Sequence, residues 1–300
     1  MPEDLNVVIT GATSGIGKEM AKTISLAGHN VFILVRDINK AKVLKREILK
    51  ENKSASLEII QCDLSLMQDV IKAVNEIKTR IDHLDVLINN AGVLINKKII
   101  TEEGFEKTIA TNHLGPFLLT MLVLDLLKKS SYSRIVNVAS SGHKQGKIEF
   151  DNLMGERKYS GLWMYTATKL MNVFFTFELA ERLKSDNITV NCFHPGFIRS
   201  NFAKNNGFFY KMLLGSLFFL TKSPKKGAET GIYLALSDEV NKITGEYFHK
   251  KKIHSVDEKA KDKIIQKKLW KTTEKLLAKY LDQSNFPETQ EKNVNPPLIT

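Results

Sequence analysis

The sequence is poor in cysteine, with only Cys62 and Cys192 among its 300 residues. Both stand in apolar, strand-like segments, so we interpret them as buried thiols rather than as parts of a disulfide framework or metal centre. Such sparse use of cysteine is typical of a reducing compartment. The 7 histidines are scattered, without a His-Glu-x-x-His motif or other paired spacing, so the sequence predicts no metal site.

Long hydrophobic runs are absent as well. No stretch reaches the length of about 18 apolar residues that suggests a membrane-spanning helix. The opening residues, MPEDLNVVIT, lack the charged and then apolar pattern of a secretory signal, which predicts a cytoplasmic protein. The longest oily segment, residues 207–220, leaves three interpretations open: a wall or lid over a substrate, a helix on a membrane surface, or part of the core.

Charge is biased toward the positive sign. Lysine and arginine number 44 against 33 acidic residues, a net charge of +11, and much of the excess lies in residues 250–279. A basic segment can attract anionic lipid, so peripheral contact with an intracellular membrane stays open. Its apolar residues recur at helical spacing, however, which favours a docked amphipathic helix with a solvated basic face. No segment interleaves aromatic with basic residues, so nucleic-acid binding is not predicted.

Short β-rich segments alternate with helix-length segments along the chain. The β-rich segments are residues 5–10, 30–35, 57–62, 84–89, 133–140, 187–194 and 245–249. The first six lack a strict in-and-out alternation, as expected for strands covered on both faces. The pattern predicts βαβ units and an α/β fold of the Rossmann type, a doubly wound parallel sheet with helices on both faces.

No internal break rich in proline, glycine and serine interrupts this pattern, so we predict a single domain over residues 1–282. It includes a variable loop at about 197–225 and a C-terminal helix at about 255–281, and a flexible tail follows at 283–300. Local signals agree with the helices. Ser65 with Gln68 resembles a capping box, Gly28 ends the first helix, and Ser223 followed by Pro224 forms an N-cap and first helical residue.

A glycine-rich turn joins the first strand to the first helix. In VVITGATSGIGKEMA, Gly11, Gly15 and Gly17 permit a tight turn and let the main chain approach a pyrophosphate. The phosphate oxygens then meet free N–H groups at the start of the helix. We therefore predict that the turn binds a dinucleotide; its candidate contacts are Gly11, Thr13, Ser14, Gly15, Ile16 and Gly17.

The end of the second strand indicates which dinucleotide binds. An NAD site needs a carboxylate there to accept hydrogen bonds from the adenosine ribose. The strand instead ends on Val35 and is followed by Arg36, whose guanidinium matches a 2′-phosphate in geometry and charge. NADP(H) is therefore favoured over NAD(H), although Asp37, the next residue, keeps NAD(H) open.

A tyrosine and a lysine stand four residues apart in YTATK, residues 165–169, about one helical turn. Ser140 ends the strand SRIVNVASS, at the sheet edge where ligands bind in such folds. NNAG at 89–92 ends the fourth strand, TNHLG at 111–115 follows it, and HPG at 194–196 ends the sixth. With LINNAGV, TNHLGPFLL and YTATKLMNVFFTFELA, the chain resembles a short-chain dehydrogenase/reductase of the retinol-dehydrogenase-like branch over about residues 5–280.

The resemblance implies catalytic roles for four residues. Tyr165 is the general acid/base that exchanges a proton with the substrate oxygen, and Ser140 polarises that oxygen. Lys169 binds the nicotinamide ribose and stabilises the tyrosinate, while Asn112 holds a water that links Lys169 to solvent. A free phenol, with its pKa near 10, is a poor base at neutral pH, and nearby positive charges favour its ionised form.

The resemblance also implies cofactor contacts outside the glycine-rich turn. Asp63 is expected to hydrogen-bond the adenine ring beside Leu64, and the main chain of Ile198 to orient the carboxamide. The full set from these segments is Asp63, Leu64, Asn89, Ala91, Gly92, Tyr165, Lys169, Pro195, Gly196 and Ile198. Relatives often have serine at the position of Ala139 and histidine at that of Pro116, and a proline there predicts a kink or a helix start.

These features predict an NADP(H)-dependent oxidoreductase that interconverts a lipophilic alcohol with its aldehyde or ketone. The aromatic residues of the variable loop suggest an apolar substrate such as a retinoid, steroid or fatty aldehyde. An alternative is a catalytically idle NADP(H)-binding scaffold or sensor, although the tyrosine, lysine and serine are all present. The family resemblance also allows a homodimer.

Overall fold

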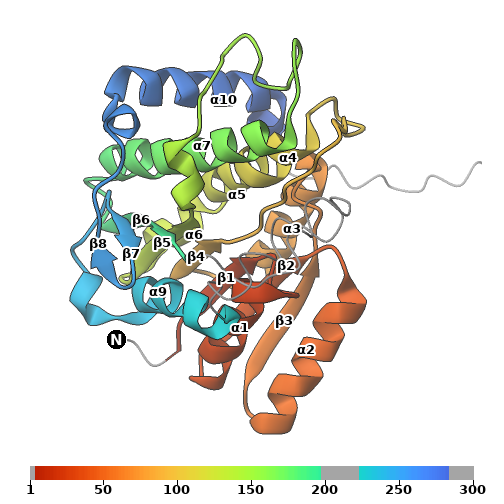
Figure 1. The fold of residues 1–300 in the computed structure, drawn as a ribbon. Helices are drawn as coiled ribbons and strands as arrows, with labels where there is room; N and C mark the ends of the chain where they lie inside the picture. Colours follow the sequence, from red (N-terminus) through yellow and green to blue (C-terminus); the bar gives the residue numbers. More distant parts are fainter. Residues whose placement is uncertain (1–3, 197–222, 284–300) are drawn as a thin grey trace, which may run out of the picture.

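The computed structural model describes residues 4–196 and 223–283, which form one α/β domain around a single sheet (Figure 1). The strands follow the order β3-β2-β1-β4-β5-β6-β7-β8, and all neighbours are parallel except β7 and β8. The predicted doubly wound sheet and the seven predicted strands are confirmed. The strands are β1 (Asn6–Thr10), β2 (Asn30–Val35), β3 (Ser56–Gln61), β4 (Val86–Asn89), β5 (Ser133–Val138), β6 (Ile188–His194), β7 (Tyr247–His249) and β8 (Lys252–Ile253).

The short antiparallel strand β8 was not predicted. It pairs with β7 through a tight turn in which Lys250 and Lys251 have φ angles of 51° and 62°. Such a turn normally uses glycine or asparagine, which tolerate positive φ. Two lysines in sequence do not predict such a turn, so the sequence contained no indication of β8.

Helices cover both faces of the sheet (Figure 1). One face carries α1 (Gly15–Leu26), α2 (Ile38–Glu51) and α9 (Pro224–Leu236). The other carries α3 (Met67–Arg80), α5 (Gly115–Leu122) and α7 (Gly161–Arg182), with the C-terminal helix α10 (Lys263–Gln283) packed on the outside of α5 and α7. Shorter pieces are α4 (Lys107–Ile109), the π-helix η1 (Ala110–Leu114), α6 (Leu124–Lys129), η2 (Ser141–Lys144), η5 (Asp238–Val240) and η6 (Glu258–Lys261).

The core consists of two apolar layers separated by the sheet. Side chains of successive strand residues point to opposite faces. Val8 of β1 therefore belongs to the same apolar layer as Phe117 and Phe174 on the α5 and α7 side, whereas Val7 belongs to the layer of Met20 and Phe248 on the α1 and α9 side. Burial on both faces explains why the strands read as continuous apolar runs.

Two of the three local helix signals behave as predicted. Gly28 follows the end of α1 with a φ angle of +97°, and the Ser223 hydroxyl accepts a hydrogen bond from the Lys226 amide at the start of α9. The predicted capping box at Ser65 and Gln68 is wrong. The N-cap of α3 is Leu66, and the carboxylate of Glu103 accepts hydrogen bonds from the first amides of the helix, among them Gln68 N at 2.9 Å.

The C-terminal helix begins later than predicted. The carboxylate of Asp262 accepts hydrogen bonds from the amides of Ile264 and Ile265, and this cap sets the start of α10 at Lys263. The preceding residues contain the short helix η6 instead of the expected first turns. Gln283, the first residue of the predicted tail, is the last residue of α10. The rest of that tail and most of the predicted variable loop lie outside the described residues.

Both cysteines are buried free thiols, as predicted. Burial raises the pKa of Cys192 to about 12, and it also raises the pKa of Cys62, so both sulfurs stay protonated and inert. Across the described part of the chain, no helix is both long enough and apolar enough to cross a bilayer.

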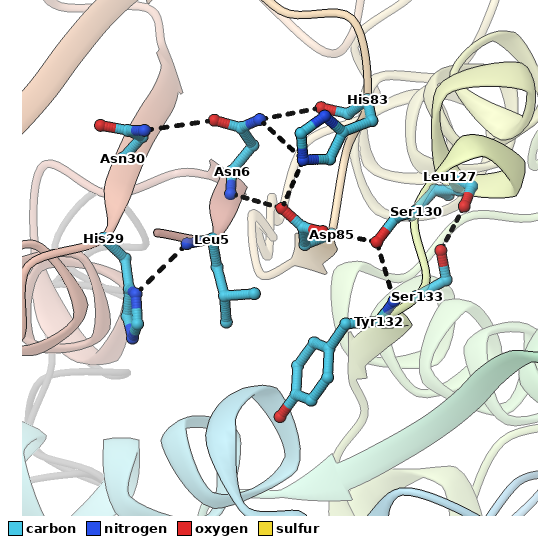
Figure 2. Close-up of polar contacts among 10 residues, drawn as sticks. All are labelled: Leu5, Asn6, His29, Asn30, His83, Asp85, Leu127, Ser130, Tyr132 and Ser133. Carbon is cyan, nitrogen blue, oxygen red and sulfur yellow. Dashed lines mark hydrogen bonds and ion pairs between the residues drawn. The ribbon is translucent and has the colours of Figure 1, made fainter. Parts of the chain in front are cut away.

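A polar network closes the sheet at the amino ends of its strands, and Figure 2 shows it. The buried carboxylate of Asp85 accepts a hydrogen bond from the Asn6 amide at 2.7 Å and another from the Ser130 hydroxyl. The ring of His83 lies 3.4 Å from the same carboxylate, and the Asn6 side chain donates to the His83 carbonyl. The network ties β1 to the segments that precede β4 and β5.

Candidate functional site

The glycine-rich turn has the geometry that a pyrophosphate requires. Gly11 and Gly15 adopt φ angles of +69° and +59°, the left-handed region that favours glycine. An ideal Cβ on Gly11 would lie 2.8 Å from the Ala91 Cα, and one on Gly17 would lie 2.6 Å from the Gly11 carbonyl oxygen. The hydroxyl of the N-cap residue Ser14 makes no capping bond, so the first amides of α1 have no side-chain cap. These are the features of a helix start that receives phosphate oxygens.

Asn90, which the sequence interpretation did not single out, holds this turn in place. Its side-chain amide donates to the Thr10 carbonyl at 2.8 Å and to the Gly11 carbonyl at 3.1 Å. The Thr10 hydroxyl accepts from the amides of Asn90 and Ala91. A Cβ on Gly17 would lie only 2.3 Å from this amide nitrogen, so a glycine is required beside Asn90.

The other predicted cofactor residues of the glycine-rich turn, and the described ones after β6, lie at the same edge of the sheet. Thr13 and Ile16 are half-buried and Ser14 is exposed. Pro195 and Gly196 follow β6, and Gly196 has a φ angle of +93°. Ile198 lies outside the described residues.

The two residues after β2, Arg36 and Asp37, differ in whether their side chains have ionic partners within the described residues. Arg36 is exposed at the carboxyl end of the strand. Asp37 is the N-cap of α2, where its carboxylate accepts from the Lys40 amide at 3.0 Å and pairs with the Lys40 ammonium at 2.7 Å. The hydrogen bonds from Lys40 lower the pKa of Asp37. Asp37 therefore already has a structural partner, whereas no described carboxylate forms an ion pair with Arg36.

Three other predicted cofactor residues have structural partners. One oxygen of Asp63 accepts from the amide and hydroxyl of Ser65 in the turn before α3. The carbonyl of the buried Leu64 packs on Gly115 so closely that a Cβ there would approach it to 2.2 Å. The Asn89 side chain points into the core and donates to Thr120 and Asn137, so Asn89 could offer only its main chain to a cofactor.

Tyr165 and Lys169 project from α7, one turn apart, toward the edge where β4 and β5 end. The Lys169 ammonium lies 5.7 Å from the centre of the Tyr165 ring and donates to the Val138 carbonyl at 2.9 Å. Lys169 is 3% exposed, and burial lowers its pKa to about 8. At neutral pH the group is still mainly charged. Its positive charge faces the phenol.

Ser140 reaches the same place from the end of β5. A Cβ on Gly142 would lie 3.4 Å from the Ser140 Oγ and 3.8 Å from the Tyr165 Cε1, so hydroxyl and ring flank one small space. The Ser140 hydroxyl also accepts a hydrogen bond from the Gly142 amide at 3.1 Å. The structure thus brings together the serine, tyrosine and lysine that the sequence singled out.

Asn112 lies in the π-helix η1, behind the lysine. Its side chain forms two hydrogen bonds with the main chain of Val93, accepting at 2.7 Å and donating at 2.9 Å. A Cβ on Gly92 would lie 3.5 Å from the Lys169 nitrogen and 3.6 Å from the Asn112 Oδ1, so all three meet. Pro116 is in the first turn of α5, directly after this π-helical turn, where its missing N–H is tolerated, so of the predicted kink or helix start the structure shows the helix start.

Comparison with known proteins identifies the family. Residues 5–208 match the model of the short chain dehydrogenase family. The chain is a short-chain dehydrogenase. It is 37% identical over 275 residues to retinol dehydrogenase 11 of Mus musculus, covering 92% of this chain and 87% of the relative. It is 38% identical over 289 residues to retinol dehydrogenase 14 of Homo sapiens, covering 90% and 85%.

These relatives confirm that the dehydrogenase belongs to the retinol-dehydrogenase-like branch. Among solved structures, an uncharacterised protein of Mycobacterium paratuberculosis superposes with a TM-score of 0.74 at 29% identity, covering 91% of this chain and 93% of that one. The family makes the protein an oxidoreductase. The residue roles within its site remain predictions.

Proposed function

We propose that the dehydrogenase uses NADP(H) to interconvert a lipophilic alcohol with its aldehyde or ketone. The observation that carries this proposal is the convergence of Ser140, Tyr165 and Lys169 beside a turn built from Gly11 and Gly17. Neither feature is specific by itself, because many turns need glycine and because tyrosine and lysine are common on helices. Together they bring an acid/base group to the edge of a dinucleotide cradle.

The residues after β2 support NADP(H) over NAD(H). A 2′-hydroxyl needs a carboxylate acceptor, and Asp37 is already used to cap α2. A 2′-phosphate needs a cation, and the exposed Arg36 can present its planar guanidinium to it. The glycine cradle and the uncapped start of α1 would hold the pyrophosphate.

The residues of the chain handle the proton. When bound, the nicotinamide supplies or accepts the hydride. In the reductive direction Tyr165 donates its phenolic proton to the substrate oxygen, while the Ser140 hydroxyl donates a hydrogen bond to the same oxygen. The buried Lys169 ammonium stabilises the phenolate that remains, and its partner Val138 holds it in place. In the oxidative direction the same phenolate takes the proton back.

Apolar side chains beside the site support a lipophilic substrate. Ile99, Ile100 and Leu162 are 44%, 49% and 54% exposed. Leu162 stands at the start of α7, and Gly161 packs there against the loop that leads to Ile99, since a Cβ on Gly161 would come within 2.4 Å of the Ile95 carbonyl oxygen. The names of the relatives suggest a retinoid, and steroids and fatty aldehydes share its apolar character.

Cofactor titration followed by nicotinamide fluorescence tests the cofactor assignment. NADPH should bind more tightly than NADH, and Arg36→Ala should weaken NADPH by about 10- to 100-fold, the range for a charge-assisted hydrogen bond, with little effect on NADH. Arg46→Ala, which removes an exposed arginine from α2, is the control. Equal affinity of wild type for the two cofactors would contradict the proposal.

Turnover of a panel of aldehydes, including all-trans-retinal, tests the activity. A wild type no faster than Tyr165→Phe would favour the alternative of an idle NADP(H)-binding scaffold. Peripheral membrane contact remains a separate proposal, supported by the exposed lysines of α10: Lys263, Lys267, Lys268, Lys271, Lys275 and Lys279. Flotation with anionic and neutral vesicles tests it, and sedimentation tests the proposed homodimer.

A further inference from the structure

Two histidines hold the peptide bond that follows the candidate catalytic serine. The ring of His143, in η2, places its Nδ1 2.7 Å from the Ser140 carbonyl oxygen. The ring of His194, at the end of β6, places its Nδ1 3.2 Å from the Ser141 amide nitrogen. The carbonyl of Ser140 and the amide of Ser141 belong to one peptide unit. The two rings therefore form hydrogen bonds with both polar groups of that peptide.

The two rings must carry their protons on different nitrogens. A carbonyl oxygen can only accept, so the Nδ1 of His143 carries a proton and donates. A main-chain amide can only donate, so the Nδ1 of His194 carries no proton and accepts. The neutral His194 ring is therefore protonated at Nε2. Its Nδ1 also accepts from the Gly196 amide at 3.3 Å, which links the serine to the turn after β6.

The surroundings restrict both rings. His143 is fully buried, and its ring meets the Tyr247 ring edge-on with centroids 4.9 Å apart. Burial lowers the pKa of His143, which keeps the ring neutral. The His249 ring stacks on that of His194 with centroids 4.9 Å apart and an angle of 22°, and the His249 Nδ1 donates to the His194 carbonyl at 3.1 Å.

We propose that His143 and His194 are positioning residues that fix the Ser140–Ser141 peptide and thereby aim the Ser140 hydroxyl at the substrate oxygen beside Tyr165. This inference rests on the proposed function of Ser140 and Tyr165. Neither histidine touches the reacting atoms. A rotation of the peptide would swing the Ser140 side chain, and displacements of about 1 Å at a reacting group can cost on the order of 100-fold in rate.

A matched pair of variants separates the hydrogen bond of His194 from its packing. His194→Phe keeps a ring against His249 but has no acceptor, whereas His194→Asn places an oxygen the same number of bonds from the main chain as the Nδ1. We expect kcat to fall about 10- to 100-fold in His194→Phe and to stay within about threefold of wild type in His194→Asn. The Kd for NADPH should change less than kcat in both, because the glycine cradle is intact.

Equal losses in the two variants would overturn the proposal, because they would assign the effect to ring packing. An unchanged kcat in His194→Phe would also overturn it. Asparagine can donate as well as accept, so His143→Asn should likewise retain activity that His143→Phe loses. If a phenylalanine variant fails to fold, His194→Gln, whose polar atoms lie one bond farther out, replaces it and should show the same loss.

The ring tautomers of the wild type test the two histidine hydrogen bonds to the Ser140–Ser141 peptide without any measurement of turnover. Nitrogen-15 NMR of histidine-labelled protein should find His143 protonated at Nδ1 and His194 protonated at Nε2. The opposite assignment for either ring would overturn the inference. If no aldehyde is turned over, the proposed function fails, while these tautomers and the hydrogen exchange of the Ser141 and Gly196 amides still decide whether the histidines hold the peptide.

Discussion

At the amino ends of the strands, the buried carboxylate of Asp85 is satisfied by the Asn6 amide and the Ser130 hydroxyl (Figure 2). At the carboxyl ends, the equally buried ammonium of Lys169 donates to one main-chain carbonyl, and no carboxylate of the described residues forms an ion pair with it. Both ends lie on the same parallel sheet. They differ in whether a buried charge has enough hydrogen-bond partners.

This difference indicates that the amino ends of the strands serve stability and that the carboxyl ends serve the proposed chemistry. A cavity lies at the amino ends, beside Asn6 and Arg80, whose side chains already bond to the His83 carbonyl and to Glu58. At the carboxyl ends, burial lowers the pKa of Lys169, so keeping its ammonium charged there costs stability. Such costs are expected where the fold serves a reaction. Substitutions at the two ends should therefore have different consequences.

The largest effect should come from Tyr165→Phe. Removal of the phenolic oxygen leaves the substrate without its proton donor, so kcat should fall by about 1,000-fold, within the usual range for general acid/base groups. Unfolding by urea should change little. The matched variant is Tyr132→Phe, which removes a hydroxyl bonded to the Leu236 carbonyl near the amino ends and should reduce stability without reducing kcat. Activity above a tenth of wild type in Tyr165→Phe would contradict the assignment.

The pH dependence of stability should reveal the buried ammonium. The pKa of Lys169 is lowered from 10.5 to about 8 in the folded protein, so between these values the unfolded chain binds more protons. Stability should then rise with pH across this window, by about 3 kcal/mol at most. Below about pH 8 the charged lysine is destabilising, and Lys169→Met should be the more stable protein.

Urea unfolding of the cofactor-free wild type and of Lys169→Met, from about pH 7 to pH 10, measures this effect. Subtraction of the two curves removes the other groups that titrate in the same range. The advantage of the methionine variant should shrink as the pH rises. A difference that does not change with pH would show that Lys169 is not desolvated.

Asp85→Asn should affect stability alone. It replaces an oxygen acceptor with an amide donor that faces the Asn6 amide or the Ser130 hydroxyl, and an unsatisfied buried group of this kind costs about 2 kcal/mol. The turnover of the folded enzyme should stay within about twofold of wild type. Asp82→Asn, at an exposed neighbouring position, is the control. Lost turnover with unchanged stability would break the distinction between the two ends.

The smallest of these effects should come from Gly17→Ala. The added Cβ would lie 2.3 Å from the Asn90 side chain and 2.6 Å from the Gly11 carbonyl, so the turn must shift. We expect NADPH to bind about tenfold more weakly, a loss of about 1.4 kcal/mol. Gly104→Ala, at an exposed left-handed glycine far along the chain, should reduce stability without weakening NADPH. Equal affinities in the two variants would argue against a cofactor at the turn.

Much of the fold could be predicted because its signals are local. Hydrophobic segments and their lengths identified all seven parallel strands, and glycines in a strand-turn-helix identified the candidate dinucleotide site. The spacing of Tyr165 and Lys169 is one helical turn, so their shared direction follows from helix geometry. Each of these inferences depends on residues that are close in the chain.

The missed features depend on residues far apart in the chain. Glu103 caps α3 from 35 residues beyond Gln68, and Asn90 holds the glycine turn from 79 residues beyond Gly11. The position of Asn90 could be predicted in part from the sequence. Alternation along β4 directs the side chains of Leu87 and Asn89 into the core, which leaves the next residue at the edge of the sheet. No local pattern indicated that Glu103 would cap α3.

Local pattern was sufficient for the order of strands and helices along the chain, the glycine turn and the one-turn spacing of Tyr165 and Lys169, since short-range sterics and periodicity control them. The catalytic roles of these residues come from the family resemblance and stay predictions. Tertiary packing alone decided how those residues are held. The partner of the Lys169 ammonium, the cap of α3 and the two histidines on the Ser140–Ser141 peptide all depend on which segments the sheet brings together. Hydrogen bonds between segments distant in the chain follow from that arrangement, and no local periodicity encodes them.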